Sequence, residues 1–385
     1  MSAAKSERHF AFTLIGIGAA STAAHLGNNF TTYLIGGLID RFGFTPTAMG
    51  AWNMTETLSY AAAMFVVAPR ARAMDARILA VLATVLVATA QASSALMSSL
   101  PLLLLGRIGT GLGFGIMNSA VNLAAGRTAH PARWISMGIA FQTIMFAAIN
   151  IGLPIVGKSY GVAGMFTALA GLTGILGLLA LTLPGGTGLE GDAATTTPNA
   201  PIGADGRRVL AAMALFAFGT LAIWPFMERT AHAIGLPATQ FGRYQSIATL
   251  MSALGNAGLA VVVKRLPRTW PLAAALGACG LACAALTTVS TEAAFAGALI
   301  AYNVSWFLTY PLLLGLAYSI DDSGRLAVMT TATWLLSQSI GSLVAGGIAQ
   351  NFGGYTLIGP MGALVCLTAV AVALPIARRL DQRLS

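Results

Sequence analysis

Long apolar stretches, separated by short polar or basic loops, dominate this sequence. Twelve of them follow one another, each close to the ~20 residues that an α-helix needs to cross a hydrocarbon core of ~30 Å. A membrane-spanning β-barrel would instead alternate in hydrophobicity over ~10-residue segments. The sequence therefore predicts an all-α polytopic membrane protein, with spanning helices near 10–38, 46–68, 77–97, 101–125, 132–156, 162–183, 208–232, 238–263, 271–290, 293–318, 325–350 and 355–377.

The composition excludes several other classes. Only 9% of the residues are charged, against roughly a quarter in soluble domains. The net charge of +9 does not indicate nucleic-acid binding, because the basic residues form short clusters between apolar runs. Three cysteines within apolar runs give no disulfide framework and have no metal-ligating companions. We expect no metal and no cofactor. The first apolar run has no small-residue cleavage site and is therefore interpreted as a helix, not a signal peptide.

Basic residues also predict the orientation in the membrane. Sixteen of the 21 lysines and arginines fall on the side of the two termini, and four fall on the other side. The positive-inside rule then places both termini in the cytoplasm. Arginine and alanine are abundant, which favours a GC-rich bacterial genome and hence a bacterial inner membrane.

The chain divides at its midpoint. Residues 184–206 are rich in Gly, Thr and Pro without periodicity, which is typical of a flexible linker. We expect six-helix bundles at 1–183 and 207–385. The halves match at a constant offset of 192, as in Gly43 with Gly235 and Tyr160-Gly161 with Phe352-Gly353, which indicates an internal repeat.

One arginine interrupts the fourth apolar run. Arg107 lies ~10 Å inside the helix that begins after Pro101. At that depth a guanidinium costs a few kcal/mol unless it meets water or a buried partner. Snorkelling to the interface is the alternative.

The surrounding pattern, Leu103-x3-Arg107-x2-Thr110-Gly111-x-Gly113, resembles the fourth-helix motif of the major facilitator superfamily. Together with twelve spans and a central linker, this resemblance implies two bundles around a central cavity and alternating access by rocking. The exporter signature expected on the fifth helix is degenerate. By the same resemblance, Asp321, Asp322 and Arg325 form a charge cluster that gates the conformational change. The alternative is that these residues form a turn and a helix N-cap.

Ionisable residues inside the spans are candidates for proton coupling. Glu56 lies near the middle of the second helix, where a carboxylate must be protonated or paired with a cation. A coupling group has to gain and lose a proton as access alternates. Arg107 is its natural partner, and a static structural ion pair is the alternative. Glu228 follows Pro225 and adjoins Arg229. An ion pair at the membrane interface is one interpretation of Glu228, and a role in proton coupling is the other. His25 has a side chain that titrates near neutral pH, or it is neutral and hydrogen-bonded.

Several helices carry polar or aromatic residues at helical spacing, which favours a shared substrate cavity, although such stripes also join helices. The predicted cavity residues are Asn28, Asn29, Thr32, Asn53, Asn118, Gln142, Trp224, Gln245, Asn303, Trp306, Trp334 and Gln338.

These observations predict a monomeric secondary active transporter of a small organic solute, coupled to protons. We favour uptake of an organic or aromatic anion. Proton-antiport efflux of drugs or of lipophilic or cationic metabolites is the alternative, and a membrane sensor or enzyme is a remote one. No nucleophile–base set or nucleotide motif is present in the sequence, so we expect no enzyme.

Overall fold

The computed structural model describes residues 3–67, 70, 73–128, 130–185, 202–262, 266–321 and 325–382, and these fold into helices joined by short turns. They group into two compact units. The first comprises Met1–Phe44 and Thr55–Gly191, and the second comprises Thr45–Met54 and Asp192–Ser385. Each unit has its own packed core, and each is described by itself below.

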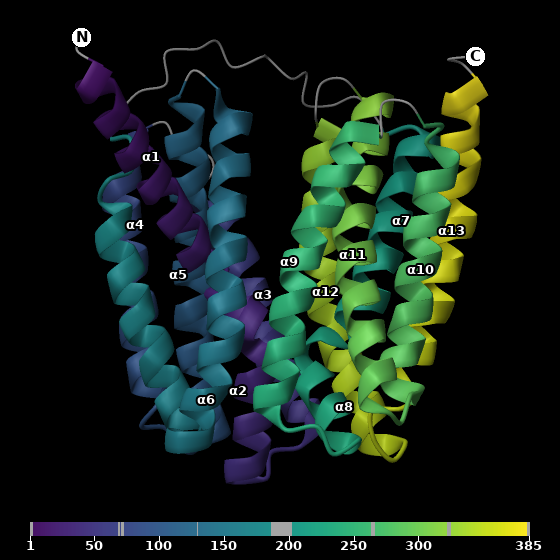
Figure 1. The fold of residues 1–385 in the computed structure, drawn as a ribbon, viewed down its shortest axis with the longest axis horizontal. Coiled ribbons are helices and arrows are strands. Elements are labelled where there is room, and N and C mark those ends of the chain that lie inside the picture. Colours follow the sequence, from purple (N-terminus) through teal and green to yellow (C-terminus); the bar gives the residue numbers. More distant parts are fainter. Residues whose placement is uncertain are drawn as a thin grey trace. The chain divides into compact units, whose positions relative to one another are not determined.

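The first unit runs from purple to teal in Figure 1. Within it α1 packs along α6 and α4 packs along α5, and α2 packs mainly against α6. Its helices are α1 (Ala3–Ala24), α2 (Leu26–Phe42), α4 (Ala76–Ser94), α5 (Leu100–Gly126) and α6 (Pro131–Ala180). Helix α3 (Pro46–Val67) belongs to this unit from Thr55 onward.

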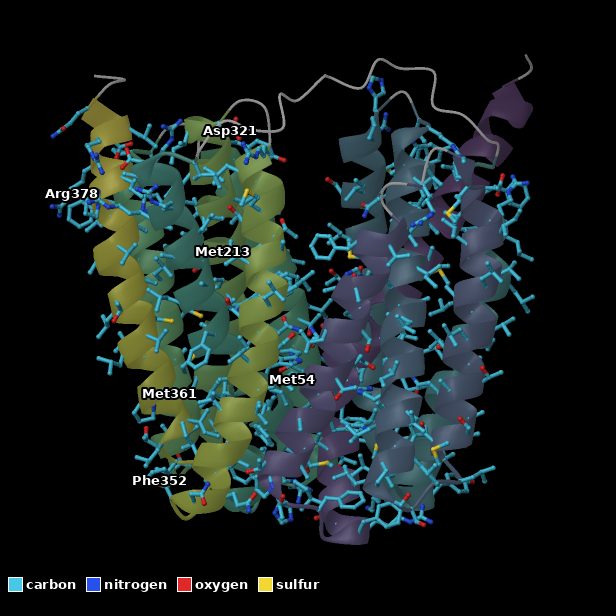
Figure 2. The ribbon with its side chains drawn as sticks, turned by 180° about the vertical axis from the view of Figure 1, so that it is seen from behind. Met54, Met213, Asp321, Phe352, Met361 and Arg378 are labelled. Atoms are coloured by element: carbon cyan, nitrogen blue, oxygen red, sulfur yellow. The ribbon has the colours of Figure 1, made fainter. Side chains whose placement is uncertain are left out.

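Apart from Thr45–Met54, the second unit runs from teal to yellow in Figure 1, and α10 packs along α13 while α11 packs along both α9 and α10. Asp321 and Arg378 lie at one end of this bundle and Phe352 at the other (Figure 2). Its elements are α7 (Ala204–Leu221), η2 (Trp224–Phe226), α8 (Met227–Ala233), α9 (Ala238–Val262), α10 (Thr269–Thr288), α11 (Glu292–Ile320), α12 (Arg325–Asn351) and α13 (Ile358–Gln382).

The observed helices follow the predicted apolar runs, and eight described helices are long and apolar enough to cross a membrane. Two predicted spans are interrupted. The first breaks at His25, between α1 and α2. The seventh breaks after Leu221 and continues as the short η2 and α8, where Pro225 cannot donate a backbone hydrogen bond. The fifth and sixth spans form the single element α6, divided at Gly161.

Glycines with positive φ mark the internal repeat. Gly43 (φ 66°) and Gly235 (φ 82°) end α2 and the short α8 segment, and both were matched at the offset of 192. Gly161 (φ 64°) and Gly353 (φ 75°) form a second matched pair. Only glycine adopts this backbone conformation without a steric cost. The two halves of the chain therefore turn at equivalent positions.

The helix starts also keep the same offset, since α3 begins at Pro46 and α9 at Ala238, and α5 begins at Leu100 and α11 at Glu292. Most of the predicted linker, residues 186–201, lies outside the described residues. Within the described part, α7 begins at Ala204.

Candidate functional site

The first unit contains a buried ion pair. Nη1 of Arg107 on α5 lies 2.6 Å from Oε2 of Glu56 on α3. The two residues are 1% and 2% exposed. Arg107 therefore has a buried partner and does not extend to the surface. Because both charges are shielded from solvent, separating them would leave an uncompensated charge, which typically costs about 3–5 kcal/mol.

Two threonines hold this pair in place. The hydroxyl of Thr110 donates to Oε2 of Glu56 (2.7 Å), and Nη2 of Arg107 donates to the hydroxyl of Thr31 on α2 (2.7 Å). Three helices thus meet at the pair. The second carboxylate oxygen, Oε1 of Glu56, is buried and accepts no hydrogen bond from any described residue.

Glycines allow the helices to approach closely at this point. A Cβ at Gly111 would overlap the backbone oxygen of Glu56, and one at Gly115 would overlap that of Tyr60. On α2, a Cβ at Gly27 would overlap Oε1 of Glu56 and the ring of Phe114. The glycines of α5 therefore place α5 against the backbone of α3, as small residues do between membrane helices.

His25 occupies the break between α1 and α2. Its Nδ1 lies 2.9 Å from the carbonyl oxygen of Ser21, and its own carbonyl accepts a hydrogen bond from the side chain of Asn29 (2.9 Å). The imidazole ring lies 6.4 Å from the ring of Tyr60. Gly27, which adjoins the Glu56 carboxylate, is two residues away. The break is thus two residues along the chain from a glycine that contacts the ion pair.

The second unit contains another buried ion pair. Nε of Arg229 lies 2.8 Å from Oε2 of Glu228, its neighbour in α8. Both side chains are less than a tenth exposed. The pair is therefore buried within the protein, and the ion pair that the sequence suggested for Glu228 and Arg229 is present. It lies just after the Pro225 interruption.

An amide pair joins α9 to α11. Nε2 of Gln245 donates to Oδ1 of Asn303 (3.1 Å), and Nδ2 of Asn303 donates to Oε1 of Gln245 (3.4 Å). Both residues are buried. Their hydrogen bonds hold the two helices together.

Aromatic rings gather between α7, α11 and α12. Trp306 stacks on Tyr310 with ring centroids 6.0 Å apart and planes at 5°, and Trp334 lies 5.6 Å from Tyr310. Phe216 also stacks on Trp306, with ring centroids 5.9 Å apart. We call Phe216, Trp306, Tyr310 and Trp334 the aromatic cluster. Trp224 does not belong to it and instead stacks on Tyr302 (6.4 Å).

The other predicted cavity residues are dispersed. Asn118 donates to Sδ of Met64 within the first unit, and Asn53 donates to Ser342 within the second. Gln338 and Thr32 are buried, and the remaining two are partly exposed, namely Asn28 and Gln142.

In the predicted gating cluster, Oδ2 of Asp321 accepts the backbone N–H of Leu326 (2.8 Å) and so caps the start of α12, which begins at Arg325. Asp322 lies outside the described residues.

Sequence reasoning did not identify Thr31, Tyr302 or Gly27. Tyr302 is 1% exposed and donates to the backbone oxygen of Thr220 (3.0 Å). Thr31 and Gly27 have no distinguishing pattern of their own, because their importance depends on which helix faces α2. The i+4 spacing of Gly27 and Thr31 was the one signal available.

The fold and this site define a class of protein: a polytopic helical membrane protein in two compact units, with ion pairs buried inside the spans. The family model of the Major Facilitator Superfamily matches residues 16–345, most of the chain. The chain belongs to the Major Facilitator Superfamily.

Solved structures agree in fold. The nucleoside transporter NupG is similar with a TM-score of 0.72 and 14% identity, over 95% of this chain and 98% of that one. The xylose transporter XylE from E. coli gives 0.71 and 13%, over 94% and 95%. A bacterial homolog of the human lysosomal transporter Spinster gives 0.68 and 16%, over 97% and 94%. A comparison with curated protein sequences finds no match.

The predicted family and the all-α, twelve-helix fold are thus confirmed. Members of this family are multi-pass membrane transporters, which establishes transport as the general function and agrees with the expectation that the chain is not an enzyme.

Proposed function

We propose that this transporter takes up a small organic anion, with an aromatic portion, together with protons, by alternating access of the halves 1–183 and 207–385. It would act as a monomer in a bacterial inner membrane with both termini in the cytoplasm. Glu56 is the proposed proton carrier and Arg107 its counter-charge.

The observation that carries this proposal is the asymmetry of the Glu56 carboxylate. Its Oε2 holds Arg107 and Thr110, whereas its Oε1 accepts no hydrogen bond from a described residue. A proton can therefore bind Oε1 without displacing either partner of Oε2. The carboxyl group gains its proton in place, which is what a coupling group must do.

Protonation would change the charge balance at Arg107. With Glu56 ionised, the two buried charges cancel. With Glu56 protonated, Arg107 keeps a positive charge that lacks a counter-ion in a poorly solvated site, and this is costly. An anionic solute would relieve that cost. Proton and anion therefore favour each other's binding, a coupling of the kind that drives symport.

Three further sites belong to this proposal. His25 lies at the helix break two residues from Gly27 and could exchange protons with the site. Glu228 is a second candidate carrier, and its ion pair with the adjacent Arg229 lies within the short helix α8. Asp321, Asp322 and Arg325 are the proposed gate at the end of α11.

A second candidate is efflux of a cationic or lipophilic compound in exchange for protons. It is favoured by the aromatic cluster, whose members and hydrogen-bond partners Thr220 and Thr331 are all uncharged. Aromatic faces attract cations. The direction of proton movement separates the two candidates.

The test is substrate-driven proton movement in proteoliposomes containing a trapped pH indicator, with benzoate, 2-naphthoate and tetraphenylphosphonium as probes. We expect an aromatic acid to drive proton co-entry in the wild type and not in Glu56→Gln. Glu292→Gln is the matched control, because Glu292 is exposed at the start of α11.

Exchange of labelled for unlabelled substrate, which needs no net proton movement, should survive in Glu56→Gln and shows that the variant is folded. Coupling that persists in Glu56→Gln would make the residue structural. Proton movement driven only by tetraphenylphosphonium, and in the opposite direction, would establish efflux.

A further inference from the structure

The aromatic cluster of the second unit contains an unsatisfied donor. The indole N–H of Trp306 donates to the hydroxyl of Thr220 (3.2 Å), and the hydroxyl groups of Tyr310 and Thr331 lie 3.4 Å apart. The indole N–H of Trp334 is buried, yet it has no hydrogen-bond partner among the described residues. Indole nitrogen is only a donor, and a buried indole N–H usually finds an acceptor.

The rings of this cluster are not fully enclosed. Trp306, Tyr310 and Trp334 are each partly exposed, whereas the neighbouring Tyr302 on α11 is 1% exposed. Threonine hydroxyls border the cluster on α7 and α12. The hydroxyl of Thr220 is buried and also donates to the backbone oxygen of Phe216 (2.8 Å), so it borders the cluster from the interior of the second unit. The cluster therefore combines partly exposed aromatic rings with hydroxyl neighbours.

The geometry within the cluster favours a flat partner. Trp306 and Tyr310 lie almost parallel, and the plane of Trp334 is tilted from that of Tyr310 by 58°. A planar ring placed against these residues can stack on one face and meet another edge-on, which are the two preferred aromatic arrangements. A saturated ring is thicker and has no π-system, so it gains neither.

From these observations we infer that the aromatic cluster binds the aromatic ring of the transported solute, and that the indole N–H of Trp334 donates to an acceptor atom at the edge of that ring. The solute is thus a planar aromatic compound carrying an acceptor, such as a carboxylate or a ring nitrogen. This inference rests on the proposed function in that the bound compound is the cargo, and it names the class to which the cargo belongs.

The inference is tested by calorimetric titration of the purified full-length protein with four probes. Two carry both features, namely 2-naphthoate and neutral quinoline. The saturated decahydro-2-naphthoate lacks the aromatic ring, and 2-naphthylmethyl-trimethylammonium lacks the acceptor. We expect the first two to bind and the other two to bind at least tenfold more weakly.

Trp334→Phe keeps an aromatic ring and removes the donor, so we expect it to weaken binding of 2-naphthoate and quinoline by about three- to tenfold, the worth of one hydrogen bond. Trp270→Phe is the matched control and should bind as the wild type, because Trp270 is 75% exposed at the start of α10. An unchanged melting temperature verifies that each variant is folded.

Equal binding of the saturated or ammonium probe, no binding of either aromatic acceptor, or unchanged affinity in folded Trp334→Phe overturns the inference. Glu56→Gln separates this result from the proposed function. That variant should still bind 2-naphthoate while losing proton movement. If Glu56→Gln still binds 2-naphthoate and still moves protons, only the proposed role of Glu56 is contradicted.

Discussion

Gln245 on α9 and Asn303 on α11 exchange amide hydrogen bonds on the two helices that the internal repeat makes equivalent to α3 and α5. In the first unit those helices carry the ion pair of Glu56 and Arg107. The two halves thus join corresponding helices by different chemistry. A neutral amide pair holds its geometry at any ordinary pH, whereas a carboxylate–guanidinium pair can change its charge.

This difference predicts non-additive stability effects at the ion pair. Glu56→Gln and Arg107→Gln each leave one buried charge without its partner, so each should lower the free energy of unfolding by about 3–5 kcal/mol. The double variant removes both charges and should lose less than the sum. Thermal unfolding in detergent measures all three proteins. If the losses of the two single variants simply add in the double variant, the side chains of Glu56 and Arg107 do not interact.

Gly27→Ala should disturb the same pair from α2. Its Cβ would overlap Oε1 of Glu56 and the ring of Phe114, so α2 must shift, at a typical overpacking cost of about 1–3 kcal/mol. We expect a lower melting temperature and reduced transport. Gly174→Ala on α6 is the control, because a Cβ there meets no atom within 4 Å. Equal melting temperatures for the two variants would contradict the close contact of α2 with Glu56.

The turn glycines should respond alike in both halves. Gly161→Ala and Gly353→Ala each force a side chain into positive φ, a backbone strain of about 1–3 kcal/mol. Thermal unfolding should show similar losses for the two variants, as expected of equivalent positions in a repeat. Gly347→Ala, in the helical part of α12 with no atom near its Cβ, should show no loss. A loss at Gly347 as large as that at Gly353 would remove the conformational explanation.

Much of the fold could be predicted because its signals are local. Hydropathy and length placed the start of α9 at Ala238 and of α12 at Arg325, where the structure has them. The offset of 192 alone pairs Gly161 with Gly353, and both have positive φ. Membrane spans have to satisfy their backbone hydrogen bonds internally, so a long apolar run leaves little choice other than a helix.

Features that depend on three-dimensional neighbours could not be predicted in the same way. The break at His25 has no proline or glycine at the break itself, and it shows only as non-helical backbone at that residue. Thr31 does not stand out in the sequence pattern, yet its hydroxyl accepts a hydrogen bond from Arg107, which joins α2 to α5. The indole N–H of Trp334, which has no hydrogen-bond partner among the described residues, likewise depends on what α11 and α12 place around it. Pairwise contacts of this kind are set by packing, not by periodicity.

Gln91 on α4 provides a stabilising substitution. It is fully buried, and neither its amide nitrogen nor its amide oxygen has a hydrogen-bond partner among the described residues. Such a group loses its hydration without compensation, at about 1–3 kcal/mol. Gln91→Leu is similar in volume and should raise the melting temperature. Gln245→Leu should lower it, because it deprives Asn303 of its partner. A destabilised Gln91→Leu would indicate that the amide is satisfied in the membrane.

Asp381 near the end of α13 joins that helix to the start of α10. Its carboxylate accepts hydrogen bonds from the backbone of Arg268 (2.9 Å) and from the backbone and hydroxyl of Thr269 (3.0 and 2.6 Å). Partial burial alone would raise the pKa of Asp381. The hydrogen bonds from Thr269 and Arg268 and the charge of Arg268 outweigh it, so the pKa lies below its ordinary value of 3.8.

This lowered pKa gives a signed pH dependence. Because the folded protein binds the proton less well than the unfolded chain, the stabilisation by the ionised Asp381 carboxylate is complete above pH 3.8 and is lost as the pH falls through the folded pKa. Asp381→Asn should therefore melt at a lower temperature than the wild type near neutral pH, with the difference shrinking in acid. Asp205→Asn, which breaks an exposed pair with Arg379, should have little effect at any pH. A difference between Asp381→Asn and the wild type that stays constant down to pH 3 would show that the ionised carboxylate is not what joins the two helices.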